Sequence, residues 1–81
     1  MNNNREKVCV MGMGYVGLTL SVVLAEVGYA VYGVDINKET IKDLSLGKPH
    51  LFEKNLTTRL NQQLKKKNIL FDIEAPSLFY D

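Results

Sequence analysis

The segment that decides the fold is VCVMGMGYVGLTLSVVLAEVGYAVYGVDIN, residues 8–37, in which three glycines stand between two apolar runs. These glycines, Gly12, Gly14 and Gly17, follow the pattern G-x-G-x-x-G. In a strand–turn–helix unit the first permits a tight turn, the second lets a pyrophosphate approach the backbone, and the third lets the helix lie close to the strand. The pattern therefore predicts a pyrophosphate-binding turn.

Two further features make this prediction more specific. Backbone N–H groups near Tyr15 and Val16, at the start of the expected helix, lack helical partners and attract an anion. Asp35 ends the next apolar run 23 residues after Gly12, close to the ~20 residues expected for an acid that binds the adenosine ribose. Because a carboxylate at this place would repel a 2′-phosphate, we expect NAD to be preferred over NADP.

Simpler interpretations of the same residues stay open. The glycines can form a tight turn without a ligand, and Asp35 can cap the next helix beside Asn37. We include Asn37 and Lys38 in the expected cofactor site, although Lys38 is more typical of an exposed lysine in a first helical turn. A nucleotide triphosphate loop is excluded, because Leu18 and Thr19 stand where Lys and Ser or Thr are required.

Apolar runs and helical periodicities alternate along the chain. We expect strands at 7–12, 29–36 and 69–73 and helices at 13–28, 37–47 and 55–68. Asn37 and Asn55 are the expected N-caps, and Gly28 and Gly47 the expected helix stops. The order of these elements predicts the α/β class. We expect a Rossmann-type doubly wound parallel sheet that is partial and truncated, with three strands and three helices. The second strand should lie between the other two. No element is expected in the tail 74–81.

Length and composition limit the classes of function. The 81 residues are 46% hydrophobic and 23% charged with a net charge of +1, so we expect no nucleic-acid or membrane partner. We interpret residues 1–81 as the N-terminal part of a dinucleotide-binding domain, with no second domain. Cys9 is the single cysteine, which excludes an internal disulfide and a cysteine zinc cluster. We expect no metal, and a reducing, cytoplasmic location.

An export signal or a membrane anchor is the main alternative for the N-terminal region. Arg5 and Lys7 precede 18 uncharged residues, 8–25, as a basic start precedes the apolar part of a signal peptide. Three glycines fall within that run, and each costs a helix roughly 1 kcal/mol relative to alanine. The pattern therefore favours a strand followed by a turn.

The segment GMGYVGLTLSVVLAEVGYAVYGVDIN resembles the start of the UDP-glucose/GDP-mannose dehydrogenase family, whose members begin with a G-x-G-Y-V-G-L turn and a V-D-I/V-N strand end. LGKPHLFEKNLTTRL is similar to the family's segment G-x-x-x-x-x-E-x-x-L. The resemblance covers roughly residues 7–73. His50 stands three residues before Glu53, and this H-x-x-E is more similar to the UDP-N-acetylmannosamine dehydrogenase type than to the UDP-glucose type.

The resemblance implies an NAD-dependent enzyme that oxidises the C6 alcohol of a UDP-sugar to a uronic acid for surface polysaccharides. Residue by residue, it places the pyrophosphate on the turn and the ribose on Asp35. It suggests a substrate role for His50 and Glu53, for which a solvated loop is the alternative interpretation. The residues that match the turn are Gly12, Gly14, Tyr15, Val16 and Gly17.

The sequence also departs from the family. No residue matches the family's nucleophilic cysteine or its catalytic lysine. Cys9 is expected to be a small buried hydrophobe, and Lys65, Lys66 and Lys67 fit an exposed helix C-terminus. We therefore expect no catalytic residue and no activity from this chain alone, with a UDP-sugar bound only in a full-length parent. A non-catalytic nucleotide-binding fragment and another NAD-dependent oxidoreductase stay as alternatives.

One consequence of this topology concerns association. In a complete dinucleotide domain the first strand is central, with a fourth strand on its other side. No fourth strand run follows in this sequence, so the strand at 7–12 would be an exposed apolar edge. We therefore expect self-association through the sheet edge.

Overall fold

The computed structural model of the chain describes residues 5–50, 53 and 55–80. All six expected helices and strands are present, and a short 3₁₀ helix follows them. In chain order the elements are β1 (Lys7–Met11), α1 (Tyr15–Val27), β2 (Ala30–Val34), α2 (Lys38–Ser45), α3 (Leu56–Lys65), β3 (Ile69–Asp72) and η1 (Ser77–Phe79).

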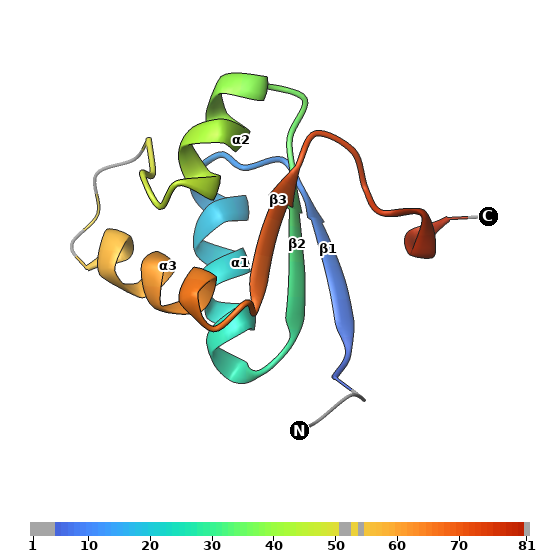
Figure 1. The fold of residues 1–81 in the computed structure, drawn as a ribbon, viewed down its shortest axis with the longest axis horizontal. Coiled ribbons are helices and arrows are strands. Elements are labelled where there is room, and N and C mark those ends of the chain that lie inside the picture. Colours follow the sequence, from blue (N-terminus) through green and yellow to red (C-terminus); the bar gives the residue numbers. More distant parts are fainter. Residues whose placement is uncertain (1–4, 51–52, 54, 81) are drawn as a thin grey trace.

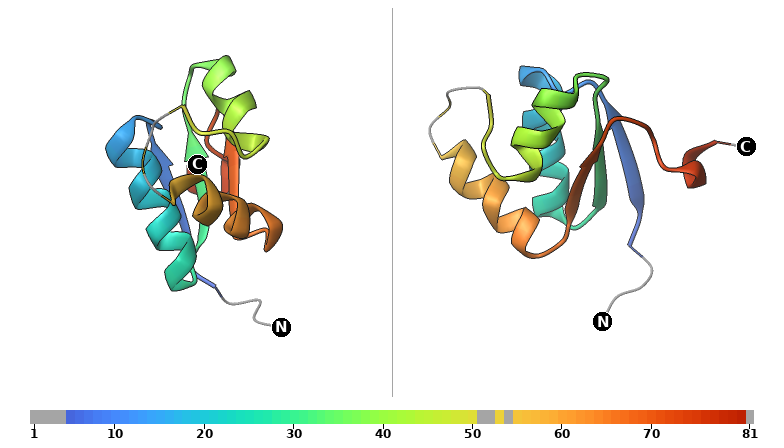
Figure 2. Two further views of the ribbon diagram at one scale, coloured as in Figure 1. Left: turned by 90° about the vertical axis from the view of Figure 1, so that its left-hand side faces the viewer. Right: turned by 45° about the horizontal axis from the view of Figure 1, so that its top comes forward.

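The strands form a parallel sheet in the order β1-β2-β3, as the alternation of strands and helices predicts. Cys9 on β1 is in register with Tyr32 on β2, and Tyr32 is in register with Leu70 on β3. The three helices lie together on one face of the sheet, with α1 over the β1 side and α3 over the β3 side (Figures 1 and 2). The α/β class and the partial Rossmann arrangement are confirmed.

The core lies between the three helices and the sheet face that they cover. The most deeply buried side chains come from every layer: Met13, Leu18, Val22, Val31, Leu44, Leu56, Leu60 and Ile69. The predicted inner positions of α1, Leu18, Val22 and Ala25, are at most 1% exposed. Val23 and Val27, which the helical pattern places beside them, are 43% and 70% exposed. The buried face of α1 is therefore narrower than the almost entirely apolar composition of this helix indicates.

Helix ends follow the expected signals with one exception. The side chain of Asn37 accepts a hydrogen bond from the backbone N–H of Thr40 at 3.0 Å, as expected of an N-cap. Gly28 ends α1 with φ of 125°, a conformation that favours glycine. Asn55 is the N-cap residue of α3, as predicted, but it takes a left-handed conformation with φ of 71° and its side chain makes no cap bond.

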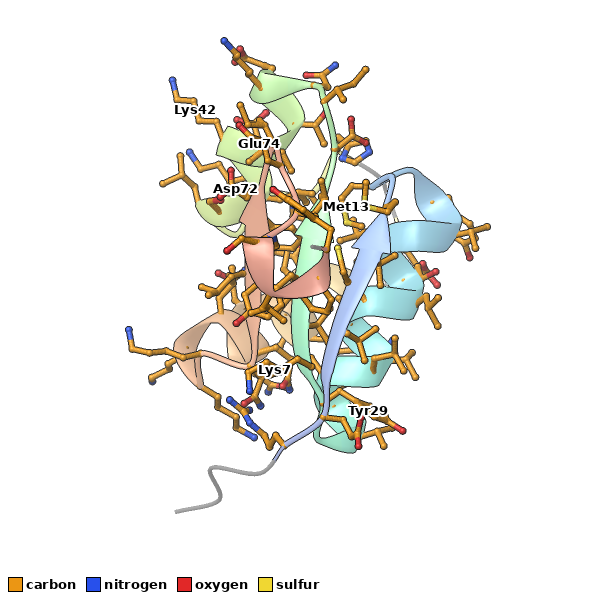
Figure 3. The ribbon with its side chains drawn as sticks, turned by 90° about the vertical axis from the view of Figure 1, so that its right-hand side faces the viewer. Lys7, Met13, Tyr29, Lys42, Asp72 and Glu74 are labelled. Carbon is orange, nitrogen blue, oxygen red and sulfur yellow. The ribbon has the colours of Figure 1, made fainter. Side chains whose placement is uncertain are left out.

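The second face of the sheet carries the C-terminal tail. The prediction that the tail lacks structure is wrong, because η1 folds back over this face (Figure 3). The ring of Phe79 meets Tyr32 edge-on, with 5.5 Å between the ring centroids. Cys9 lies on the same face and is half-buried, which corrects the expectation of full burial.

The apolar run that suggested export or anchoring is divided between two elements. Its first part forms β1, and its last part lies in α1, which has 13 residues. In the described part of the chain no helix combines the length and the apolar character needed to cross a membrane.

Candidate nucleotide-binding site

The turn between β1 and α1 begins where β1 leaves the sheet. The N–H of Gly12 donates to the carbonyl oxygen of Val34 at 2.6 Å, so the turn starts beside the end of β2. Gly12 has φ of 94°, in the region that favours glycine. This backbone turns the chain directly into α1, as a pyrophosphate-binding turn requires.

Gly17 holds α1 against the turn. A Cβ atom at this position would overlap the carbonyl oxygen of Gly12 and lie 3.0 Å from its carbonyl carbon. Both obstacles are backbone atoms, so no side-chain rotation can relieve the contact. The third glycine is therefore required for the close approach of helix and turn, which is its predicted role.

Gly14 faces open space at the N-terminus of α1. It is the N-cap residue, no side chain caps the helix, and the first turn contains no acidic residue. A Cβ at Gly14 would meet nothing within 4 Å. Tyr15 and Val16, the first two residues of α1, are exposed. The helix N-terminus is thus open to a ligand, and its N–H groups and dipole favour an anion.

Asp35 lies next to this turn, at the end of β2. Its Oδ2 accepts a hydrogen bond from the backbone N–H of Met13 at 2.8 Å, and its Oδ1 accepts one from the N–H of Asn37 at 2.9 Å. These bonds, first that from Met13 and then that from Asn37, lower the pKa of Asp35, and the charge of His50 adds a smaller effect. The carboxylate therefore stays ionised at neutral pH and retains lone pairs for further donors.

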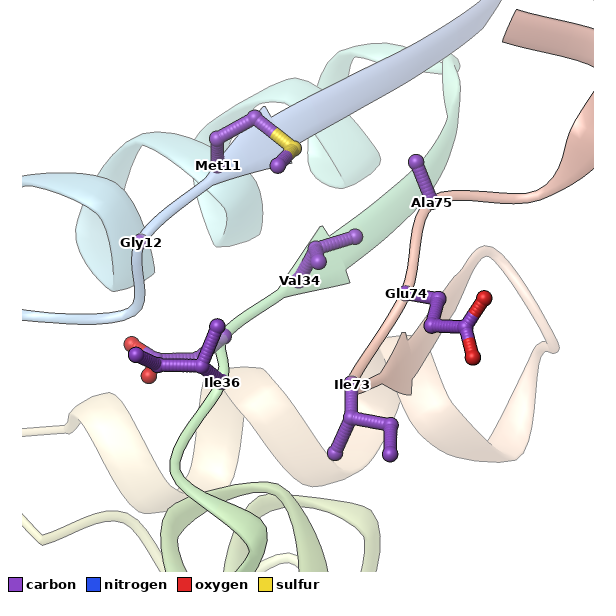
Figure 4. Close-up of a pocket in the computed structure, with 8 residues that line it drawn as sticks. Met11, Gly12, Val34, Ile36, Ile73, Glu74 and Ala75 are labelled. Carbon is purple, nitrogen blue, oxygen red and sulfur yellow. The ribbon is translucent and has the colours of Figure 1, made fainter.

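A hollow of about 220 Å³ adjoins Asp35 on the second face of the sheet. Its walls come from the ends of β1 and β2, from the residues that follow these two strands, and from the segment after β3 (Figure 4): Met11, Gly12, Val34, Asp35, Ile36, Ile73, Glu74 and Ala75. The side chain of Glu74 is directed outward, so the inner surface is mostly apolar (Figure 4). Ligand pockets for larger molecules measure about 300–1,000 Å³, so this hollow suits one flat apolar ring system of a dinucleotide.

Sequence reasoning missed most residues of this hollow. Ile36 is 91% exposed, which is unusual for a large apolar side chain. Its place directly after Asp35 was an available signal, since the residues after the strand ends line ligand sites in parallel sheets. Ile73 and Ala75 belong to the segment after β3, and no sequence signal connects that segment with Asp35.

The remaining predicted site residues lie in two places. Asn37 and Lys38 begin α2 directly after Asp35, and Lys38 is exposed. His50 is exposed in the loop after α2, and its charge reaches Asp35. Glu53 lies just before α3, where its carbonyl oxygen accepts from the N–H of Leu56. The pKa of Arg59 is raised mainly by its hydrogen bond to Glu26, and the charge of Glu53 adds to this effect. The contacts of Glu53 thus connect it with α3.

These residues fit a dinucleotide. A helix N-terminus with open space at Gly14 can receive a pyrophosphate. An ionised carboxylate beside it, on Asp35, can accept hydrogen bonds from ribose hydroxyls. An apolar hollow on the far side of the carboxylate can receive a base. The helix N-terminus, the carboxylate and the hollow therefore lie in the order of the pyrophosphate, the ribose and the base of an adenosine diphosphate group.

Comparison with known proteins identifies the family. The model of the UDP-glucose/GDP-mannose dehydrogenase family, NAD binding domain, matches residues 6–79. UDP-N-acetyl-D-mannosamine dehydrogenase of Methanococcus aeolicus is 40% identical over 68 residues, which are 84% of this chain and 16% of that enzyme. The corresponding enzyme of Pyrococcus horikoshii is 32% identical over 78 residues, or 90% of this chain and 19% of that enzyme.

Solved structures agree with the sequence comparison. UDP-N-acetyl-mannosamine dehydrogenase from Staphylococcus aureus matches 86% of this chain with a TM-score of 0.84 and 33% identity. UDP-glucose dehydrogenase from Pyrobaculum islandicum matches 91% with a TM-score of 0.83 and 29% identity. The chain spans 17% and 18% of these two proteins. It therefore belongs to the UDP-glucose/GDP-mannose dehydrogenase family, where it corresponds to the NAD-binding domain, and its cofactor is NAD.

Proposed function

We propose that residues 1–81 are the N-terminal part of the NAD-binding domain of a nucleotide-sugar 6-dehydrogenase. In such an enzyme the C6 alcohol of a UDP-sugar is oxidised to a uronic acid with the uptake of one water, a four-electron change for which two NAD molecules in succession would each accept one hydride. The observation that carries the proposal is the bond between Asp35 and the N–H of Met13, which places an ionised carboxylate directly beside the turn. The names of the relatives support a UDP-N-acetylmannosamine substrate for the full-length parent.

Each residue of the site has a binding role in this proposal. The turn from Gly12 to Gly17 receives the pyrophosphate, and Asp35 accepts hydrogen bonds from the ribose hydroxyls. Asn37 fixes the start of α2, and Lys38 lies at the rim of the ribose site. His50 and Glu53 are assigned to the side of the nucleotide-sugar, on the strength of the H-x-x-E segment alone.

Replacing Asp35 by Asn tests the ribose assignment. We expect Asp35→Asn to weaken NAD binding by roughly 10- to 100-fold, as expected when a hydrogen bond to a charged group worth about 1.5–3 kcal/mol is lost. NADP binding should change little, because the repulsion of its 2′-phosphate is removed together with the favourable bonds. Titration calorimetry with both cofactors measures the change. Asp72→Asn is the matched control, because Asp72 is an exposed carboxylate at the end of β3.

The ionisation of Asp35 gives the same test a pH dependence. Because the folded pKa of Asp35 is lowered from 3.8, the carboxylate is ionised throughout the neutral and mildly acidic range. Its contribution to stability is complete above the unfolded pKa and is lost as the pH falls through the lower folded pKa. NAD affinity should fall over the same acidic window. Equal affinity of the unmutated chain for NAD and NADP would contradict the ribose assignment.

The activity of the chain alone distinguishes among the candidate functions. Since no residue matches the family's nucleophile or lysine, we expect NAD binding without NADH formation when UDP-hexoses are added. The measurement is NADH absorbance with a panel of UDP-sugars, and Cys9→Ser is the control for the single thiol. Turnover that survives Cys9→Ser would show that other residues carry the chemistry. Binding without turnover in this chain, together with turnover in a full-length parent, would support the proposal over a purely non-catalytic protein.

A further inference from the structure

The turn between β1 and α1 has no cationic side chain of its own. The chain is uncharged from residue 8 to residue 25. The pyrophosphate of NAD is anionic, and the carboxylate of Asp35 lies directly beside the turn. Backbone N–H groups and the helix dipole offset part of this negative charge. A cation from another segment would offset more of it, and the nearby segments offer Lys38 and His50.

The loop after α2 returns to this place. Residues 46–50, drawn in yellow, leave the end of α2 and run back to the N-terminal end of α1 (Figures 1 and 2). The N–H of Gly47 donates to the carbonyl oxygen of Leu44 at 2.9 Å. Nδ2 of Asn61 on α3 donates to the carbonyl oxygen of Gly47, also at 2.9 Å. The loop is thus bonded to α2 and to α3 before it reaches His50, whose side chain is exposed.

The charge of His50 acts on Asp35. The backbone bonds from Met13 and Asn37 are the main causes of the lowered pKa of Asp35, and the positive charge of His50 lowers that pKa further. Exposed charges more than about 10 Å apart are largely screened at ordinary ionic strength, so the imidazole and the carboxylate belong to one local cluster of charges. Lys38 is nearer to Asp35 in the sequence and is not a cause of this shift.

We propose that His50 is a cofactor-binding residue, whose imidazole donates a hydrogen bond to the pyrophosphate of NAD. The proposal rests on the proposed function in one respect, that the turn receives the pyrophosphate. The N–H groups at the start of α1 hold the phosphates from one side, and the imidazole binds them from the loop after α2. When protonated, it also offsets the negative charge of the phosphates and of Asp35. This role differs from the nucleotide-sugar role that the H-x-x-E segment alone suggests for His50.

Replacing the charge of His50 tests the assignment. We expect His50→Gln to weaken NAD binding by roughly three- to tenfold in titration calorimetry, because a charge-assisted hydrogen bond at an exposed site is lost. His50→Lys should keep the affinity within about twofold of that of the unmutated chain, because an ammonium group also donates to phosphate. Lys48→Gln is the matched control, because it removes an exposed positive charge from the same loop. It should leave the affinity unchanged, and circular dichroism checks the fold of every variant.

Fragments of the cofactor locate the contact. ADP contains the pyrophosphate, whereas adenosine contains the ribose and the base alone. We expect His50→Gln to weaken ADP by the same factor as NAD and to leave adenosine unchanged. Titrations followed by NMR chemical shifts measure the weak affinities of these fragments. An equal loss for adenosine would show that His50 acts on the ribose through Asp35, and would overturn the assignment to the pyrophosphate.

The remaining outcomes separate this proposal from the proposed function. NAD binding that Asp35→Asn weakens and His50→Gln leaves unchanged would overturn the role of His50 alone. Equal losses in His50→Gln and Lys48→Gln would show a general effect of the charge of the loop, and would overturn the contact with the pyrophosphate. Failure of the unmutated chain to bind NAD would overturn both proposals together.

Discussion

Gly17→Ala should unfold the domain. The added methyl group would overlap the carbonyl oxygen of Gly12, and the backbone of the turn cannot move away without separating α1 from β1. Overpacking against side chains costs about 1–3 kcal/mol, and a collision with backbone atoms exceeds that range, so we expect a loss of about 4 kcal/mol or more. A domain of this size has little stability in reserve. Circular dichroism with urea denaturation measures the loss.

Gly33→Ala is the matched control for this effect. A Cβ at Gly33 would lie 2.7 Å from the ring of Phe71 and 2.9 Å from Sδ of Met13, so the obstacles there are side chains. Met13 can take another rotamer, and we expect a loss of about 1–3 kcal/mol. If Gly17→Ala were as stable as Gly33→Ala, the close contact of α1 with the turn would not be a requirement of the fold.

Gly14→Val should leave the fold intact and abolish NAD binding. Gly14 has φ of −74° and ψ of −165°, an extended conformation that valine adopts readily, and a Cβ there meets no atom within 4 Å. The cost to stability is limited to the N-cap preference, a few tenths of a kcal/mol to about 1. The branched side chain would fill the space in front of the helix N-terminus, where the pyrophosphate is proposed to lie. We expect a loss of affinity of at least about 100-fold, or roughly 2.7 kcal/mol.

Urea denaturation and titration calorimetry on the same samples separate these two effects. Gly14→Ala should give an intermediate affinity, because a single methyl group fills less of the space. Val16→Ala serves as a control at the helix start, since Val16 is 73% exposed and its truncation opens space. Unchanged NAD affinity in Gly14→Val would show that the pyrophosphate binds elsewhere.

The sequence by itself determined the elements and their order, because the signals for them are local. The spacing of Gly12, Gly14 and Gly17 describes a turn of a few residues, and backbone sterics within that turn require glycine at its first and third positions. The role of Asp35 was also predictable from the sequence. Asp35 follows the second strand, and the strand–helix–strand unit specifies the number of residues between the turn and an acid at this place. Asn37 was predictable as an N-cap because its partner, the N–H of Thr40, is three residues away.

Only the tertiary structure decided which distant segments meet. The hollow beside Asp35 combines Ile36 with Ile73 and Ala75, and the tail reaches Tyr32 through Phe79. No pattern within either segment specifies such a contact, because it depends on how the parallel strands pair and where their carboxyl ends lie. The absence of a side-chain cap bond at Asn55 has a similar origin: its left-handed backbone depends on how the chain enters α3, and local propensity does not contain that information.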